Sequence, residues 1–382
     1  MNLESYKGRE QAYIKHTLLR SYLERLFMIL GQHHKTICYV DCFAGPWKEG
    51  GNNLSDTSIA ISLDIMEKCR KGLFLKSKRD VKFRALFIEK NKIAYNKLCK
   101  YLGNRLCDGI VTEAKHGEFL ELRDTILDWC GKHDFTFFFI DPTGWKDVVE
   151  IETLRPLLKR NNSEYLINFM FDFIRRSIPQ NTFERQMREI FGEIPDTNNM
   201  TPDEKEDYLL KLYIRRLKET QSASGLKPRA AKVQILHPTQ NRTKYYLLYL
   251  TRHSRGIQVF MKTSEKIGII QRRVHAQTKQ NYRVAKNRQP ELFSVETTEF
   301  SDDDSDLSAV KEYWLRKLTE EPQRFDLDML ADMLEETGWF ESYLQNALKE
   351  LIKVGIVQNM DTNRLRPKNV VDFTKCERLK RM

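Results

Sequence analysis

The sequence predicts an α/β protein with a Rossmann-like, mostly parallel sheet of seven strands, a helical insertion and a smaller C-terminal domain. Strand-like apolar runs alternate with helical stretches over residues 37–170, which is typical of a parallel sheet covered on both faces. The run 135–140 is continuously apolar and so predicts a central strand. A chain of 382 residues exceeds one hydrophobic core, so we expect two domains.

The predicted elements of the sheet domain follow one another as strand–helix units. Residues 9–31 carry apolar positions at helical spacing and predict a leading helix. Strands are expected at 37–40, 83–88, 109–114, 135–140 and 165–170, with helices at 57–69, 91–102, 118–129 and 150–160. The charged segment 179–228 predicts a helical insertion or lid, and strands at 231–236 and 245–250 predict a hairpin that completes seven strands.

The C-terminal part predicts a winged helix-turn-helix. Residues 296–306 are polar and acidic and indicate a linker between domains at 1–295 and 307–382. Helices are expected at 307–318, 326–335 and 340–353, followed by a turn at 354–357 and a polar hairpin at 359–368. Three short helices followed by a β-wing are the order of elements in that motif.

Composition limits the classes of protein. No apolar run approaches the roughly 20 residues of a membrane span, and the N-terminus lacks an apolar signal segment, so we expect a cytoplasmic protein. Seven scattered cysteines without a CxxC pair predict buried free thiols and no metal site. The net charge of +11 and the pI near 9.1 favour a polyanionic partner.

The positive charge is concentrated in one segment. Residues 252–288 hold ten Lys or Arg and a single acid, Glu265. The segment predicts either a nucleic-acid contact surface, with Tyr282 stacking on a base, or a solvated basic helix. The acidic majority in 308–360 also leaves open that the winged domain docks on a protein partner. The predicted nucleic-acid-binding residues are Arg252, Arg272, Arg273, Lys279, Tyr282, Arg283, Lys286 and Arg288.

Acids and a glycine turn follow successive predicted strands. Asp41 and the turn Ala44–Gly45 follow the first strand, Glu89 the second, Glu118 the third, and Asp141–Pro142 the fourth. In open α/β sheets ligands bind beyond the carboxyl ends of the strands. Taken alone, each acid is better explained as a helix cap or a turn residue. Together, in this order, they favour a nucleotide pocket. The turn lacks the G-x-G-x-x-G pattern of dinucleotide-binding proteins, and Trp47 stands where a further glycine would make room for a pyrophosphate. Both features argue against a dinucleotide cofactor.

These residues resemble known motifs. Residues 41–46 (DCFAGP) resemble motif I of class I S-adenosylmethionine (SAM)-dependent methyltransferases, Glu89 resembles their motif II acid, and 141–145 (DPTGW) is similar to the (D/N)PP(Y/F) motif of amino-methyltransferases. Over residues 10–270 the chain is most similar to the three-Cys-motif partner (TcmP) family. The resemblance implies a class I methyltransferase sheet, SAM as cofactor and a neighbouring three-Cys iron–sulfur protein as a possible partner.

The resemblance also assigns roles to residues. Asp141 and the Pro142 carbonyl would accept the N–H groups of an exocyclic amine, and Trp145 would stack on the flipped base. Thr143 and Trp145 depart from the motif. Lys15–His16 resembles a Lys-His pair near the cofactor in rRNA adenine-N6 methyltransferases; a helix-surface pair is the equal alternative. The implied cofactor-binding residues are Lys15, His16, Asp41, Phe43, Ala44, Gly45, Glu89, Glu118 and Asp141.

Three functional hypotheses follow. The first is a SAM-dependent methyltransferase acting on a base of DNA or RNA. The second is a methyltransferase-like scaffold without chemistry that binds nucleic acid or a partner protein, which the altered DPTGW motif favours. The third, a small-molecule methyltransferase, leaves the basic segment without a role.

Overall fold

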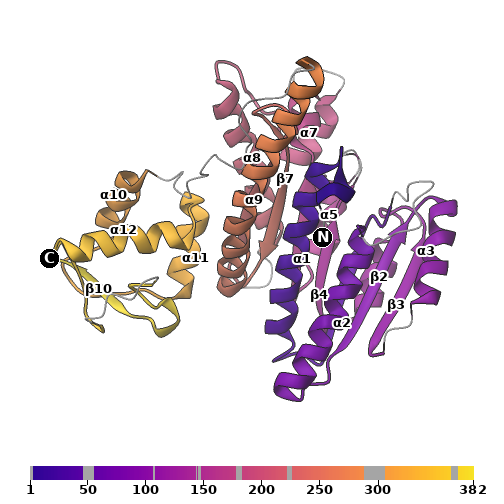
Figure 1. Ribbon diagram of the computed structural model, residues 1–382, viewed down its shortest axis with the longest axis horizontal. Coiled ribbons are helices and arrows are strands. Elements are labelled where there is room, and N and C mark those ends of the chain that lie inside the picture. Colours follow the sequence, from indigo (N-terminus) through magenta and orange to yellow (C-terminus); the bar gives the residue numbers. More distant parts are fainter. Residues whose placement is uncertain are drawn as a thin grey trace. The chain divides into compact units, whose positions relative to one another are not determined.

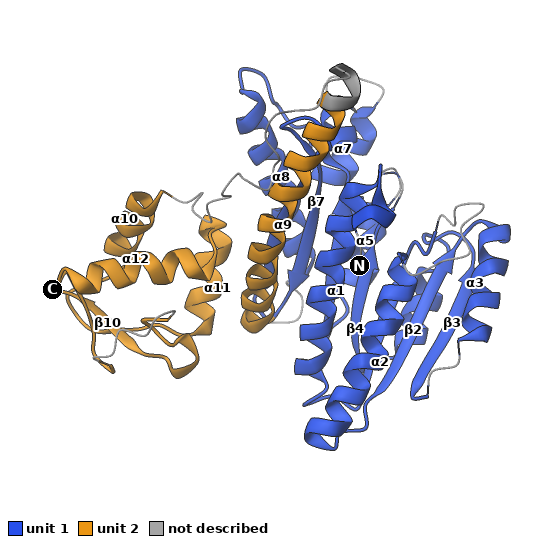
Figure 2. Cartoon of the chain, in the orientation of Figure 1, with its two compact units in different colours: residues 1–252 blue, residues 253–382 orange. Residues whose placement is uncertain are grey.

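The chain forms two compact units, residues 1–252 and residues 253–382 (Figure 2). The computed structural model describes residues 3–45, 56–105, 108–142, 144, 148–177, 183–221, 226–287, 306–362 and 369–382. The predicted boundary at 295 differs from this division, because the helix over the basic segment is grouped with the C-terminal unit. Apart from Asp306, the predicted acidic linker lies outside the described residues.

The N-terminal unit contains the predicted seven-stranded sheet. Its strand order is β3-β2-β1-β4-β5-β7-β6. The first five strands are parallel, β7 runs antiparallel to β5, and β6 runs antiparallel to β7. The strand order therefore reverses between β1 and β4, which is where ligands bind in such sheets. The strands are β1 (Thr36–Asp41), β2 (Lys82–Glu89), β3 (Ile110–His116), β4 (Phe135–Ile140), β5 (Ser163–Phe169), β6 (Arg229–Leu236) and β7 (Thr243–Thr251).

Helices connect and cover these strands (Figure 1). The predicted helices are present, and α2 continues to Ser77, past the expected end at Cys69, because Leu73 extends its buried face. Thr57 caps α2 by accepting the N–H of Ala60 at 3.2 Å. The described helices of this unit are η1 (Leu3–Tyr6), α1 (Glu10–Leu30), α2 (Ser58–Ser77), α3 (Lys92–Asn104), α4 (Arg123–Cys130), α5 (Ile151–Leu158), α6 (Phe171–Ser177), α7 (Glu184–Phe191) and α8 (Pro202–Gln221).

The aromatic strand β4 is buried on both faces, as its apolar run predicts. All six of its residues are buried. Because side chains alternate along a strand, Phe137 stacks on Tyr39 on one face, with ring centroids 6.2 Å apart. Phe138 stacks on Tyr165 on the other face, at 5.3 Å. β4 is thus the centre of the sheet.

Helix α1 is fixed to the sheet by a buried hydrogen-bond network. Tyr22 donates to the carboxylate of Glu164 at 2.8 Å and lies 2.6 Å from the hydroxyl of Tyr249. Thr251 donates to the other oxygen of Glu164 at 2.9 Å. Burial raises the pKa of Glu164. Since α1 ends just before β1, its first turns lie at the carboxyl edge of the parallel strands.

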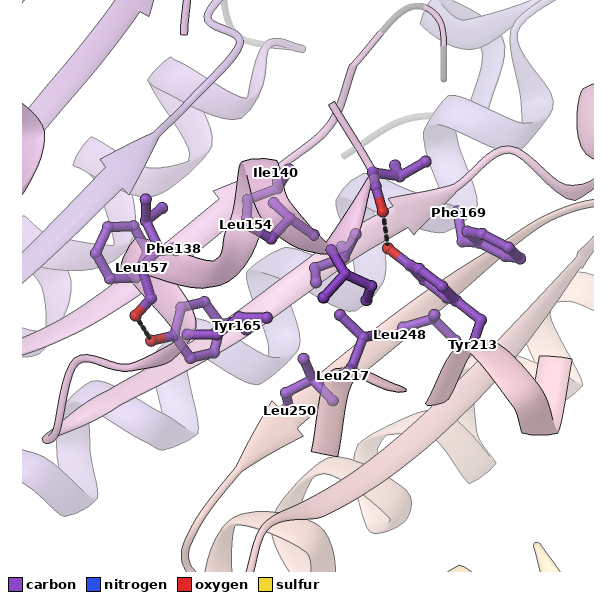
Figure 3. Packing of buried hydrophobic residues seen from close by; sticks show 14 of the residues in the cluster. Phe138, Ile140, Leu154, Leu157, Tyr165, Phe169, Tyr213, Leu217, Leu248 and Leu250 are labelled. Atoms are coloured by element: carbon purple, nitrogen blue, oxygen red, sulfur yellow. Dashed lines mark hydrogen bonds between the residues drawn. The ribbon is translucent and has the colours of Figure 1, made fainter. Parts of the chain in front are cut away.

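Helix α8 is part of the hydrophobic core, so this segment is not the lid that was one of the two predictions for residues 179–228. Its buried residues join the cluster beneath β4, β5 and β7 (Figure 3). Tyr213 stacks on Phe169 with centroids 4.2 Å apart, and its hydroxyl donates to the Val149 carbonyl at 2.6 Å. The segment 183–221 is therefore an integral helical layer.

The C-terminal unit is a winged helix preceded by a long basic helix. Helix α9 (Ser254–Asn287) packs on α11 (Leu327–Thr337) and α12 (Glu341–Lys353), and Gln258 donates to Glu341 at 3.0 Å. Helix α10 (Leu307–Lys317) packs on α12. The strands β8 (Gln323–Arg324), β10 (Arg378–Arg381) and β9 (Val357–Asn359) form an antiparallel sheet, with η5 (Phe373–Lys375) before β10. The predicted winged helix-turn-helix is confirmed; 363–368 of its predicted hairpin lie outside the described residues.

We expect Tyr213→Phe to lower the free energy of unfolding by about 1–3 kcal/mol, because the Val149 carbonyl loses its donor inside the core. Urea unfolding followed by circular dichroism measures the change. The control is Tyr208→Phe on the same helix, whose partly buried ring has no hydrogen-bonded hydroxyl among the described residues. Equal losses in both variants would contradict an integral role for Tyr213.

Candidate functional site

Two carboxylates lie at the adjacent ends of β1 and β4. Asp41 pairs with Phe139 in the register of these strands, and Asp141 follows β4. Asp41 is fully buried, and it accepts from the Ser58 hydroxyl at 2.6 Å and from the Phe43 N–H at 3.1 Å. Burial, with a smaller contribution from the charge of Asp141, raises the pKa of Asp41 to about 7. Asp41 therefore lies beneath the turn and fixes it to the start of α2.

Asp141 is held from two sides. Lys15 of α1 donates to one carboxylate oxygen at 2.5 Å, and Asn168 of β5 donates to the other at 2.7 Å. The side chains of Lys15 and Asp141 are only 13% and 17% exposed, so the ion pair is sheltered from solvent. The structure thus brings two predicted site residues together across three elements.

Asn168 is a site residue that the sequence analysis missed. It is buried in β5, and its Oδ1 atom has no hydrogen-bond partner among the described residues. A buried polar atom without a partner is uncommon. In the sequence, Asn168 is visible as a single polar residue inside the apolar run 165–170. The run gives no reason to connect Asn168 with Asp141.

His16 takes a different environment from its neighbour. It is 9% exposed, and its Nδ1 lies 3.1 Å from the hydroxyl of Tyr6. Burial, then the charge of Lys15, lowers the pKa of His16 to about 3, so the ring is neutral. Lys15 points to Asp141, whereas His16 packs with η1; the structure therefore separates the two halves of the predicted pair.

The glycine turn lies against Glu89. A Cβ atom at Gly45 would come within 1.9 Å of the Oε2 atom of Glu89. The Ala44 N–H donates to the Ile88 carbonyl at 2.8 Å, which joins the turn to the end of β2. Glu89 is 7% exposed; its Oε1 accepts the Asn91 N–H at 2.6 Å, and no described donor reaches Oε2. The contact between the Glu89 carboxylate and the turn agrees with the predicted nucleotide pocket. The hydrogen bond to the Asn91 N–H agrees with the alternative interpretation, in which Glu89 caps the start of helix α3.

The remaining predicted cofactor residues lie nearby with unequal exposure. Phe43 packs on Phe119, with centroids 5.3 Å apart, so the turn contacts the segment after β3. Glu118 is exposed and pairs with Lys90 at 3.4 Å. Pro142 is buried, and within the described chain nothing donates to its carbonyl. Thr143, Trp145, Pro46 and Trp47 lie outside the described residues.

The predicted phosphate contacts are divided between interior and surface. Arg252 is 7% exposed, and its guanidinium donates to the carbonyls of Arg160, Leu158 and Gln221 at 2.8–3.2 Å. Its prediction as a nucleic-acid contact does not fit this buried position. Six of the other predicted residues lie on α9: Arg272 and Lys279 are partly buried, Arg273, Tyr282 and Arg283 are exposed, and the side chain of Lys286 is outside the described part of the chain. Arg288 also lies outside the described residues.

Comparison with known protein families and solved structures bears on the fold of the chain. Residues 281–364 match the GMT-like wHTH domain family, so the winged helix is supported independently. No curated protein matches in sequence. Among solved structures the chain is similar to a Legionella pneumophila str. Philadelphia 1 protein of the DUF519 family (12% identity, 69% of this chain, 92% of that chain, TM-score 0.37).

Two methyltransferase structures are also similar. The Rickettsia typhi protein PKMT2 with AdoHcy shows 10% identity over 63% of this chain and 55% of that chain, with a TM-score of 0.28. Loganic acid methyltransferase with SAH shows 12% identity over 88% of each chain, with a TM-score of 0.25. These scores are low, so the confirmed fold class, a methyltransferase-like sheet with a winged helix, rests on this chain's own strand order. None of these names the TcmP family or an iron–sulfur protein, and both stay predictions.

No described helix is both long and apolar enough to span a bilayer.

We expect Asp41→Asn to remove a pH dependence of stability. A pKa raised from 3.8 to about 7 means that the folded state binds the proton more tightly than the unfolded chain. This contribution to stability is complete below about pH 4 and is lost as the pH rises to 7, with an upper limit of about 4 kcal/mol. Urea unfolding across this range, with exposed Asp124→Asn as control, measures it. Parallel profiles for wild type and Asp41→Asn would contradict the assignment.

Proposed function

We propose that this protein is a SAM-dependent methyltransferase that acts on an exocyclic amine of a nucleic-acid base. The observation that carries the proposal is the placement of Asp141, held by Lys15 and Asn168, at the same sheet edge as the Gly45–Glu89 contact. Both features lie beside the point where the strand order reverses, between β1 and β4.

The residues around Gly45 fit the cofactor. Because Gly45 has no side chain, the Glu89 carboxylate can lie directly against the turn. Its Oε2 atom has no donor within the described chain, and two ribose hydroxyls are suitable donors. Glu89 would hold the ribose, Ala44 and Gly45 would line the methionine side, and Phe43 would offer its ring to the adenine. When bound, SAM supplies a methyl group activated by its sulfonium.

Asp141 and Pro142 position the acceptor. An ionised carboxylate has about four lone-pair positions, so two remain after Lys15 and Asn168 donate. One N–H of the amine donates to Asp141 and the other to the unoccupied Pro142 carbonyl. Both bonds localise the nitrogen lone pair, and the carboxylate stabilises the positive charge that develops on nitrogen.

The structure also gives a reason for the alternative, a scaffold that binds nucleic acid without chemistry. The ammonium of Lys15 lies 2.5 Å from Asp141 and competes with an amine for the same oxygen. In that case Lys15 and Asp141 form a structural ion pair between α1 and β4. Methyl transfer by wild-type protein and by Asp141→Ala separates the two functions.

The proposed partner is DNA or RNA. The winged-helix unit and the basic surface of α9, with exposed Arg273, Tyr282 and Arg283, support it. The TcmP resemblance adds a three-Cys iron–sulfur protein as a proposed second partner.

We expect Glu89→Gln to weaken SAM binding by at least about tenfold, because a charge-assisted hydrogen bond contributes about 1.5–3 kcal/mol. The amide keeps an acceptor for the Asn91 N–H, so the turn is preserved. Isothermal titration with SAM measures the effect, and exposed Glu121→Gln is the control. Equal affinities for wild type and Glu89→Gln would remove the ribose assignment.

We expect Asp141→Ala to reduce methyl transfer at saturating SAM by about 100-fold or more, since a preorganised polar group at the reacting centre is lost. Incorporation of labelled methyl groups into total DNA and RNA measures the rate, with exposed Asp128→Ala as control. Undiminished incorporation refutes the catalytic assignment of Asp141. Wild-type protein that binds SAM and transfers nothing supports the scaffold instead.

A further inference from the structure

Four cations at the edge of the sheet have no role in the proposed chemistry. We call them the Arg-Lys cluster: Arg175 and Arg176 on α6, Arg242 in the β6–β7 loop, and Lys244 on β7. All four belong to the N-terminal unit.

The cluster lies beside the acceptor residues. Helix α6 begins directly after β5, the strand that carries Asn168 to Asp141. β7 is antiparallel to β5, with Tyr246 opposite Phe169, so Lys244 falls at the carboxyl edge of the parallel strands. The ammonium of Lys15 lies 6.0 Å from the ring centroid of Tyr245, the residue after Lys244. Asp141 and the cluster therefore share one edge.

The cluster carries more positive than negative charge. Asp172 alone receives Arg175 at 3.0 Å, Arg176 at 3.5 Å and Arg242. Glu206 also reaches this edge, but the hydroxyls of Thr243 and Tyr246 donate to it. Four cations against Asp172, Glu206 and Glu10, whose charge also acts on Lys244, leave an excess of one positive charge.

Lys244 is the most informative member. Its side chain forms no hydrogen bond and no ion pair with any described residue, although it is only partly exposed. Burial, then the charge of Lys15, lowers the pKa of Lys244; Asp172 and Glu10 act in the opposite direction. An ammonium held near other cations without a partner lowers stability unless an anion binds there. Arg175, Arg176 and Arg242 keep 40%, 58% and 34% of their side chains exposed, so they reach solvent as well.

We propose that the Arg-Lys cluster binds phosphodiester groups of the nucleic-acid strand whose base enters the Asp141 site. This inference rests on the proposed function. Every base in a strand is flanked by phosphates, so a base at Asp141 brings such groups to the neighbouring edge. Arginine forks and a lysine are the common ligands of phosphate. An acidic peptide offers carboxylates to the same cations but no base for the Asp141 site, which favours the nucleic-acid strand.

The test uses Lys244→Gln in the full-length protein, because this change breaks no described bond. Binding of fluorescein-labelled, mixed-sequence single-stranded RNA and DNA is measured by anisotropy over a range of salt. We expect a loss of about threefold in affinity and a salt slope smaller by about 0.7, the values for one lost phosphate contact. The thermal midpoint should stay equal or rise, whereas a structural role for Lys244 would lower it.

Matched variants complete the test. Arg175→Gln/Arg176→Gln should weaken binding in the same direction, and Lys97→Gln/Lys100→Gln, two exposed cations on α3, should leave it unchanged. A photoreactive oligonucleotide should cross-link to peptides from α6 or the β6–β7 loop. Cross-links confined to residues 253–382, with unchanged affinity and salt slope for Lys244→Gln, overturn the proposal. Polyglutamate that competes as well as the oligonucleotide overturns it in favour of an acidic protein.

SAM titration keeps this proposal distinct from the proposed function. Lys244→Gln should bind SAM as wild type does, because Lys244 is not placed in the cofactor pocket. If the wild type binds no SAM, but oligonucleotide affinity still depends on Lys244, the methyltransferase proposal fails and the phosphate site stands. If SAM binds and the cluster variants bind oligonucleotide normally, the phosphate site fails alone.

Discussion

Two carboxylates at neighbouring strand ends impose the main electrostatic constraint on the N-terminal unit. Asp41 and Asp141 lie at the ends of paired strands, where like charges in a poorly solvated environment destabilise one another. The two carboxylates are stabilised in different ways. Asp41 is satisfied by local donors and its pKa rises, whereas Asp141 obtains a cation from α1 and an amide from β5. The site is therefore inseparable from the packing of α1.

That packing in turn depends on a further buried carboxylate, Glu164. Glu164 receives the hydroxyls of Tyr22 and Thr251 and so joins α1, β5 and β7. Lys15 lies seven residues before Tyr22 on the same helix, about 10 Å along its axis. The network fixes the axial position of α1, and this position sets Lys15 at Asp141. A chain of hydrogen bonds in the interior thus determines the geometry of a site at the sheet edge.

The sheet was predictable because strand signals are local. The apolar run in β4, and the acids that end β1 and β2, are visible in the sequence without knowledge of contacts. The function of a polar residue inside a strand is not local: Asn168 matters only because Asp141 lies opposite, a pairing of residues 27 positions apart. The prediction of Arg252 as a nucleic-acid contact does not fit the structure for the same reason. Charge counting placed it on a surface, yet its donors are used by carbonyls from Leu158, Arg160 and Gln221.

The net charge of +11 therefore overstates the cations that are available to a polyanion. The guanidinium of Arg160, like that of Arg252, donates hydrogen bonds to main-chain carbonyls, among them those of Gly131 and Asp134. Such arginines hold loops together and contribute little to a binding surface. Lys244 is the opposite case, because the fold shelters it and supplies no partner. The number of donors that the fold leaves unsatisfied, more than the total charge, indicates where an anion binds.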